Sequence, residues 1–172
     1  MSVVINGSTG ITSPGGDTGA ADFTINGVTV GKGGGSVSGN TAVGNGAMNG
    51  NTTSSNQTAV GYRALYSSNG GDNDAFGYQA LYSNTSGNLN AAFGENALYT
   101  NTTGANNVAM GLAALNKNST GGSNTAMGVS ALTNNTTASN NTAVGYQAGY
   151  SNTTGTGNQY LGYMAGRSEE HT

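Results

Sequence analysis

A glycine that recurs at a nearly fixed interval is the strongest constraint on what this chain can fold into. In seven of eight copies it follows an alanine and a hydrophobic residue, and successive copies are 17 residues apart except for one step of 16 between Gly61 and Gly77. A period kept this closely indicates tandem structural repeats rather than irregular low-complexity chain. The repeat glycines are Gly44, Gly61, Gly77, Gly94, Gly111, Gly128, Gly145 and Gly162.

Other positions of the repeat are equally regular. Alanine always stands three residues after the glycine, and leucine usually stands four after it, with Gly149 and Gly166 in the last two copies. The unit reads roughly N-T-A-V-G-Y-x-A-L-Y-x-N-T-T-x-x-x. Four residues before the glycine, Gln57 is the one departure from a column formed by Asn40, Asn73, Asn90, Asn107, Asn124, Asn141 and Asn158.

The unit is too short for a helical hairpin, since helical repeats need about 33 residues or more. It is also rich in Gly and Asn, which are poor helix formers. We therefore predict an all-β fold, a parallel β-solenoid or β-roll of about eight 17-residue coils, left-handed or at least parallel. Each coil is expected to hold two short strands, N-T-A-V-G and Y-x-A-L-Y, with N-T-T-G as the turn that climbs to the next coil.

In such a stack, equivalent residues lie about 4.7–4.9 Å apart, so eight coils would span roughly 38 Å. Identical side chains then form ladders, and the asparagine amides can hydrogen-bond along the axis. We expect two columns to supply the large core residues: the Val/Phe/Met/Leu column just before the glycine and the leucine column after it. The constant alanines indicate a close approach of backbone to the opposite strand or to another chain.

Two large apolar residues per coil make a thin core, and the chain has no Trp and three Phe. A lone solenoid of this kind would be marginally stable. The small alanine columns and the tyrosines outside the core columns favour several chains packed or intertwined together, and we predict a homotrimer. A head-to-tail polymer is a second arrangement, because uncapped solenoid ends recruit other chains.

The repeat pattern divides the chain into three segments. Residues 1–35 precede the repeats and contain short predicted strands at 3–5, 23–25 and 28–30, with a loop at 12–20. They are interpreted either as a cap on the solenoid or as an attachment element. Residues 36–166 form the repeat array, and residues 167–172 form a C-terminal tail.

Charge excludes several functions. Only 6% of residues are charged and the net charge is −3, so no cationic cluster exists to bind nucleic acid or a membrane surface. No apolar run approaches the ~18 residues of a membrane span, and no signal peptide is visible at the N-terminus. Cysteine is absent.

No motif predicts catalysis, a cofactor or a metal. Gly31–Ser36 lacks the order of a phosphate-binding loop. The run 72–74, Asp-Asn-Asp, lacks the spaced acidic set of a calcium loop. The single histidine, His171, and the pair Glu169-Glu170 lie in the tail, and Glu95 stands alone. We therefore expect no enzyme activity.

The N-T-T turn has two further interpretations. It generates N-x-[ST] sequons at Asn51, Asn84, Asn101, Asn118, Asn135 and Asn152, which we interpret as turn chemistry rather than glycosylation. It also stacks threonines into columns, which raises ice binding as an alternative function. Adjacent threonines point in different directions, whereas an ice-binding face needs alternate residues on one side of a strand.

The motifs N-T-A-V-G-Y-Q-A (141–148) and N-D-A-F-G-Y-Q-A-L (73–81) resemble the repeats of bacteriophage tail fibre proteins. So do the segments V-V-I-N-G-S-T-G-I-T (3–12) and F-T-I-N-G-V-T-V-G-K-G-G-G (23–35). N-T-A-V-G is also distantly similar to the N-S-V-A-I-G repeat of trimeric autotransporter adhesin heads, whose unit is shorter.

The resemblance implies a trimeric fibre of the virion, or an extracellular one, used in host attachment. The partners would be copies of the chain itself and a host-surface receptor or glycan. Receptor-binding residues are unknown. The alternatives are an extracellular filament-forming or bacterial surface adhesin subunit, and an ice-binding solenoid.

Overall fold

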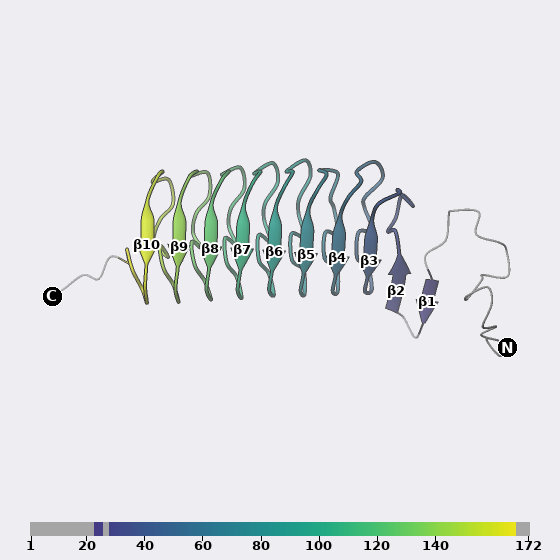
Figure 1. Ribbon diagram of the computed structural model, residues 1–172, viewed down its shortest axis with the longest axis horizontal. Helices are drawn as coiled ribbons and strands as arrows, with labels where there is room; N and C mark the ends of the chain where they lie inside the picture. The colour runs from purple at the N-terminus through teal and green to yellow at the C-terminus, as the bar shows by residue number, and fades with distance from the viewer. Residues whose placement is uncertain (1–22, 26–27, 168–172) are drawn as a thin grey trace.

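The computed structural model describes residues 23–25 and 28–167, which form a β-solenoid (Figure 1). This part of the chain contains ten strands and no helix, and therefore no helix that could cross a membrane. The all-β and solenoid predictions are confirmed. The strands are β1 (Phe23–Ile25), β2 (Val28–Gly31), β3 (Thr41–Val43), β4 (Thr58–Val60), β5 (Asp74–Phe76), β6 (Ala91–Phe93), β7 (Val108–Met110), β8 (Thr125–Met127), β9 (Thr142–Val144) and β10 (Gln159–Leu161).

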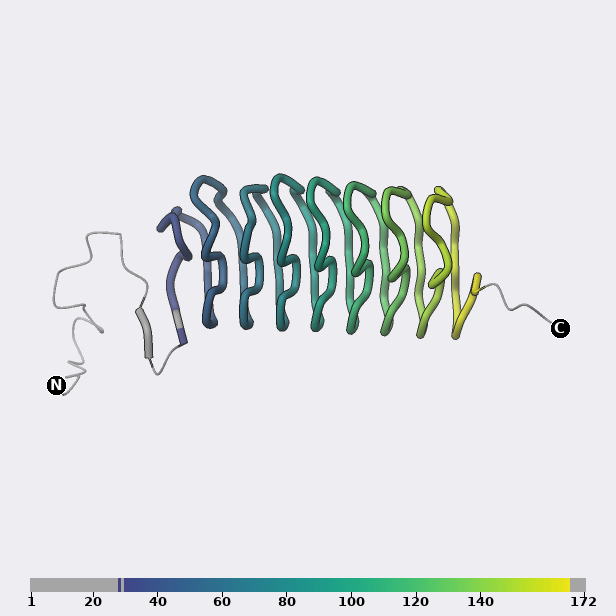
Figure 2. Tube along the Cα trace, turned by 180° about the vertical axis from the view of Figure 1, so that it is seen from behind, coloured from purple at the N-terminus to yellow at the C-terminus, as the bar shows by residue number. Residues whose placement is uncertain are grey.

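Strands β3 to β10 pair in parallel, each with the next in sequence, through seven pairings, so the chain completes about seven turns. Equivalent repeat positions lie side by side: Ala92 of β6 pairs with Ala109 of β7, for example. The 16-residue step does not shift this register, because Ala59 pairs with Ala75. Figure 2 shows the resulting row of similar coils.

Each coil contains one three-residue strand, so the prediction of two strands per coil was wrong. The Y-x-A-L-Y segment is interrupted by left-handed backbone at two positions, such as Arg63 (φ 53°) and Leu65 (φ 49°). It still bonds to neighbouring coils, since Arg63 N–H donates to Asn45 O and Leu65 N–H to Ala80 O, both at 3.0 Å. The backbone ladder therefore continues where the strand geometry does not.

The core is built from alanine and leucine. The alanine two residues before each repeat glycine, except the last copy, and the alanine three after it are buried in coil after coil, together with the residue after the second alanine. The largest of these core side chains are Met48, Leu65, Leu81, Leu98, Leu115 and Leu132. The coil is narrow enough for one leucine and two alanines to fill its apolar half.

The Val/Phe/Met/Leu column before the glycine points outward, and its assignment to the core was wrong. Successive residues of a strand face opposite sides. Because the alanine two before the glycine points inward, the next residue must face outward. Met110 is 41% exposed and Leu161 66% exposed.

At the N-terminal end of the stack, two antiparallel strands continue the sheet beyond β3. β1 pairs with β2, and β2 pairs antiparallel with β3, with Val30 opposite Val43. The strands predicted at 23–25 and 28–30 are thus present. The predicted strand at 3–5, the loop at 12–20 and residues 168–172 lie outside the described residues.

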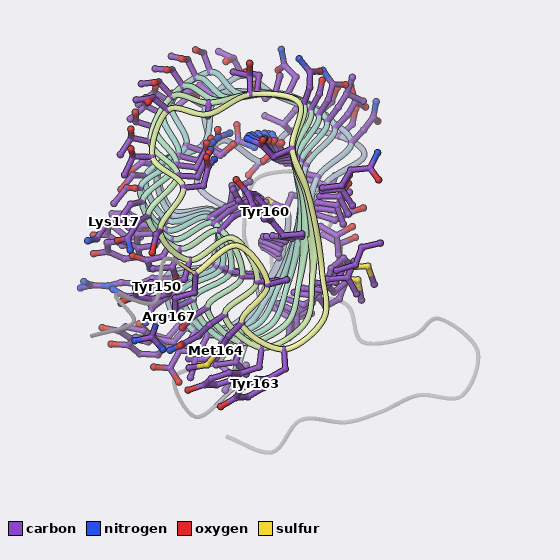
Figure 3. The ribbon with its side chains drawn as sticks, turned by 90° about the vertical axis from the view of Figure 1, so that its left-hand side faces the viewer. Lys117, Tyr150, Tyr160, Tyr163, Met164 and Arg167 are labelled. Carbon is purple, nitrogen blue, oxygen red and sulfur yellow. The ribbon has the colours of Figure 1, made fainter. Side chains whose placement is uncertain are left out.

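At the other end, Tyr160 fills the core (Figure 3). It stands where other coils have alanine, and Gly149 and Gly166 stand where they have leucine. A Cβ added to Gly149 would lie 2.6 Å from the Cδ2 atom of the Tyr160 ring. One inward tyrosine thus takes the space of two missing leucines.

Candidate interaction surface

The repeat glycines lie at the sharp corner of each coil. Seven of them have φ between 133° and 141°, and Gly162, in the last coil, has φ 116°, a region that favours glycine. Steric contact also requires glycine at this position, because a Cβ added to Gly94 would lie 2.6 Å from the carbonyl oxygen of Gly111 in the next coil. The column is therefore a structural requirement of the stack and carries no side-chain chemistry.

The asparagine column before the strands lies inside the solenoid and forms a continuous hydrogen-bonded run from Asn73 to Asn158. The Oδ1 atom of each residue accepts from the backbone N–H of the next one, as in Asn107 N–H to Asn90 Oδ1 at 3.0 Å. From Asn90 to Asn141 the side-chain Nδ2 donates to the same oxygen, at 3.1–3.2 Å. Upstream, Gln57 N–H bonds Asn40 Oδ1, but no side-chain bond joins Gln57 to Asn73.

A second asparagine ladder, which the sequence analysis missed, runs parallel to the first. It joins the sequon asparagines from Asn84 to Asn152, and Asn101 Nδ2 donates to Asn84 Oδ1 at 3.0 Å. The same bond recurs between Asn118 and Asn101, Asn135 and Asn118, and Asn152 and Asn135. The signal was present as an Asn at this turn position in every coil but one, which turn chemistry alone does not require.

The two ladders meet at a shared column of carbonyl oxygens. Gly104 O accepts from Asn90 Nδ2 and from Asn101 Nδ2, both at 2.9 Å. Among the described residues, the only buried side-chain polar atom without a hydrogen-bond partner is Gln57 Oε1. Because the interior polar groups bond one another, a binding function has to be sought on the outer surface.

The most distinctive outer feature is a band of apolar side chains on both sides of the glycine corner, here called the apolar strip. Its first column precedes the glycines and contains Val43, Val60, Phe76, Phe93, Met110, Met127, Val144 and Leu161. Its second column follows the glycines and contains Tyr62, Tyr78, Leu112, Val129, Tyr146 and Tyr163, with Asn45 and Glu95 in the same positions of two coils. Tyr78 is 48% exposed and Tyr163 73% exposed. Figure 3 shows Tyr163 projecting outward at the corner.

Tyrosines form stacks along and beside the strip. The rings of Tyr62 and Tyr78 are 5.3 Å apart and nearly parallel, and Tyr146 and Tyr163 repeat this geometry. A neighbouring stack joins Tyr82 to Tyr66 at 5.1 Å and to Tyr99 at 5.2 Å. Where rings stack, their faces meet those of adjacent coils, so these stacks present mainly ring edges and hydroxyls to the outside.

Charged side chains are sparse on this surface. Arg63 lies over the rings of Tyr62 and Tyr66, with its Cζ 5.1 and 5.3 Å from their centroids. Glu95 is the one charged residue within the strip columns. An almost uncharged strip can approach another apolar surface with little desolvation cost.

The acidic run 72–74 does not converge on a point. Asn73 is buried in the first ladder, whereas Asp72 and Asp74 are exposed. Asp72 Oδ1 accepts from Asn56 Nδ2 at 3.1 Å. Within the part of the chain that the structure describes, no three His, Asp or Glu side chains gather as metal ligands would; His171 and the pair Glu169-Glu170 lie outside that part.

The two threonine columns differ in what they present. In the first column, hydroxyls donate to a carbonyl of the next coil, as in Thr85 Oγ1 to Thr102 O and Thr102 Oγ1 to Ser119 O, both at 2.9 Å. In the second column, residues such as Thr103 are exposed. One of the two columns therefore uses its hydroxyls to hold the coils together.

No family model, no curated protein and no solved structure matches this chain.

Proposed function

We propose that this chain is a shaft segment of an extracellular fibre, of the kind found in phage tail fibres, in which three copies pack side by side along the apolar strip. The observation that carries the proposal is the strip itself. It runs through every coil from β3 to β10, and its first column contains no polar residue. A solvated surface has no physical reason to exclude polar residues from one column in eight successive coils.

The size of the strip supports an interface. A full aromatic side chain covers about 150–250 Å², so one that is two-fifths exposed leaves roughly 60–100 Å² in water. Summed over the strip's apolar side chains this is on the order of 1,000 Å². The largest apolar patch on a typical monomer is about 300–600 Å², while each partner in a standard interface contributes about 800 Å².

The interior supports the role of a rigid shaft. Both asparagine ladders and the backbone ladder direct their hydrogen bonds along the solenoid axis, so bending must disturb all three. The tail-fibre assignment and the role in host attachment rest on the resemblance of the repeats and of segment 23–35 to such fibres.

The oligomeric state tests the proposal directly. Sedimentation and native mass spectrometry should give a trimer, and electron microscopy should give discrete short rods. The double variant Met110→Lys, Met127→Lys places charges in the strip and should dissociate the trimer into monomers without unfolding the coils. The matched control, Thr103→Lys with Thr120→Lys, places the same charges on exposed turn positions and should leave the trimer intact.

The proposal is wrong if the wild-type protein is monomeric at every concentration. It is also wrong if the Met110→Lys, Met127→Lys variant associates as well as the Thr103→Lys, Thr120→Lys control. Long filaments instead of discrete rods would favour the polymer-forming alternative. Attachment is tested separately by binding of the labelled trimer to host cells, and a thermal-hysteresis measurement should give no ice-binding activity.

A further inference from the structure

We infer that the 16-residue step divides the solenoid into two cooperative units, so that residues 28–60 open before residues 74–161. The step between Gly61 and Gly77 lies in the coil of residues 57–72, here called the short coil. Three departures from the repeat coincide there: a lost ladder bond in the first asparagine column, a lost asparagine in the second, and a missing turn residue.

The first asparagine ladder is interrupted at Gln57. From Asn73 onward, each side-chain oxygen accepts from the next residue of the column, but no such bond joins Gln57 to Asn73. Gln57 instead donates its Nε2 to Gly70 O at 2.5 Å, which leaves its buried Oε1 without a partner. An unsatisfied buried acceptor weakens the structure around it.

The second ladder is interrupted in the same coil. Ser68 stands at the ladder position, and the only side-chain ladder bond that it makes with the next coil is Asn84 Nδ2 to Ser68 Oγ at 3.2 Å. The missing residue also lies here, because one residue separates Ser68 from Gly70 where two separate Asn84 from Gly87.

The next junction shows what is lost. Between the coils of Asn73 and Asn90, three amide bonds connect the ladders: Asn90 N–H and Nδ2 to Asn73 Oδ1, and Asn101 Nδ2 to Asn84 Oδ1. At the junction after the short coil, the corresponding side-chain bonds are Asn84 Nδ2 to Ser68 Oγ at 3.2 Å and Asn73 Nδ2 to the backbone oxygen of Gly70 at 2.8 Å, and no bond joins two ladder amides.

The backbone continues across the short coil, with Gly77 N–H to Val60 O at 2.9 Å and Thr58 N–H to Asn73 O at 3.0 Å. The junction between the short coil and the next coil therefore keeps the two units in register, but it couples them more weakly than the other junctions couple their coils. In a solenoid, each coil contacts only its neighbours, so stability is a sum of coil terms and junction terms. A weak junction separates the array into units that open independently.

Hydrogen exchange of the full chain, followed by mass spectrometry, tests the division. Amides of β3 and β4 should exchange at least about tenfold faster than those of β6 to β8, with a step between residues 60 and 74. A single common rate for β3 to β8 overturns the inference. So does a smooth coil-by-coil gradient from the N-terminal end, because simple end fraying predicts a gradient rather than a step.

Two variants distinguish the effect of the ladder side chains from the effect of their position in the chain. The double variant Gln57→Asn, Ser68→Asn restores both ladder side chains and should slow exchange in β3 and β4 by about tenfold. The reciprocal variant Asn124→Gln, Asn135→Ser installs the same pair of side chains in a later coil and should create a second step between β8 and β9. If neither variant changes where the exchange rate steps, the ladders do not determine the boundary between the cooperative units.

Discussion

The side-chain oxygen of Asn107 accepts two hydrogen bonds from Asn124, one from its backbone N–H at 3.0 Å and one from its Nδ2 at 3.1 Å. Asn107 Nδ2 in turn donates to Asn90 Oδ1 at 3.1 Å and to Gly121 O at 2.9 Å. One buried amide thus joins three coils. Its four bonds are made where water cannot replace them.

Replacing Asn107 by alanine should therefore destabilise the protein by about 2–4 kcal/mol. It leaves the buried backbone N–H of Asn124 and one of the two Nδ2 hydrogens of that residue without an acceptor, while the other hydrogen keeps Ala138 O. Urea unfolding followed by circular dichroism measures the loss. The control Asn49→Ala removes an exposed amide and should change stability by less than about 0.5 kcal/mol. Equal effects of the two substitutions would mean that the ladder contributes nothing beyond an ordinary surface amide.

Two of the repeat glycines allow the strain of a positive φ to be distinguished from the steric clash of an added Cβ. Gly111→Ala combines an unfavourable φ of 136° with a Cβ 2.5 Å from Gly128 O. Gly162→Ala has an unfavourable φ of 116° but no atom within 4 Å of its Cβ. Backbone strain alone costs about 1–3 kcal/mol. We expect Gly162→Ala to lose that amount and Gly111→Ala to lose clearly more, measured by thermal unfolding.

Left-handed positions should tolerate or prefer glycine. Ala113 has φ 55°, a conformation that costs an L-residue about 1–2 kcal/mol. Ala113→Gly should raise the free energy of unfolding by about 0.5–1 kcal/mol after the larger chain entropy of glycine is counted. Ala105, which is also half-buried and lacks a positive φ, should lose stability on the same substitution. Destabilisation of both variants would refute the strain argument.

The Tyr160 core should behave as a coupled unit. Tyr160→Ala leaves a cavity beside Gly149, and Gly149→Leu alone drives a side chain into the Tyr160 ring. The double variant restores the Ala and Leu pattern of earlier coils, and the φ of 63° at Gly149 is close to the 49° at Leu132. We expect both single variants to be destabilised and the double variant to recover by about 1–3 kcal/mol relative to additivity. Additive effects would show that Tyr160 and residue 149 do not compete for one space.

The period and the corner glycines allowed the solenoid to be predicted from sequence, because only a stack of coils explains a glycine every 17 residues. The inside of the coil was harder to predict. A Val or Phe beside an Ala looks like the better core residue, yet the narrow cross-section accepts Ala59 and turns Val60 outward. The second strand was also predicted wrongly, since nothing in the residue type of Leu65 or Arg63 announces a positive φ.

The second ladder was missed for a related reason. Asn101 precedes two threonines, and that triplet is what a turn would contain on local grounds. Its role is set by the coils above and below, which a reading of one unit does not include. The first column of the apolar strip was visible in the sequence, but its side chains were assigned to the core. The second column was represented only by tyrosines placed outside the core.

Gly104 O receives one amide from each ladder. Every coil from Asn90 to Asn124 presents the same donors on one side and the same acceptors on the other. A coil inserted between these coils would therefore make the same hydrogen bonds to its neighbours, and removal of a coil would leave neighbours that can bond each other. Length in this protein is a modular quantity: unequal recombination between repeats can lengthen or shorten the rod in steps of one coil without redesigning its interior.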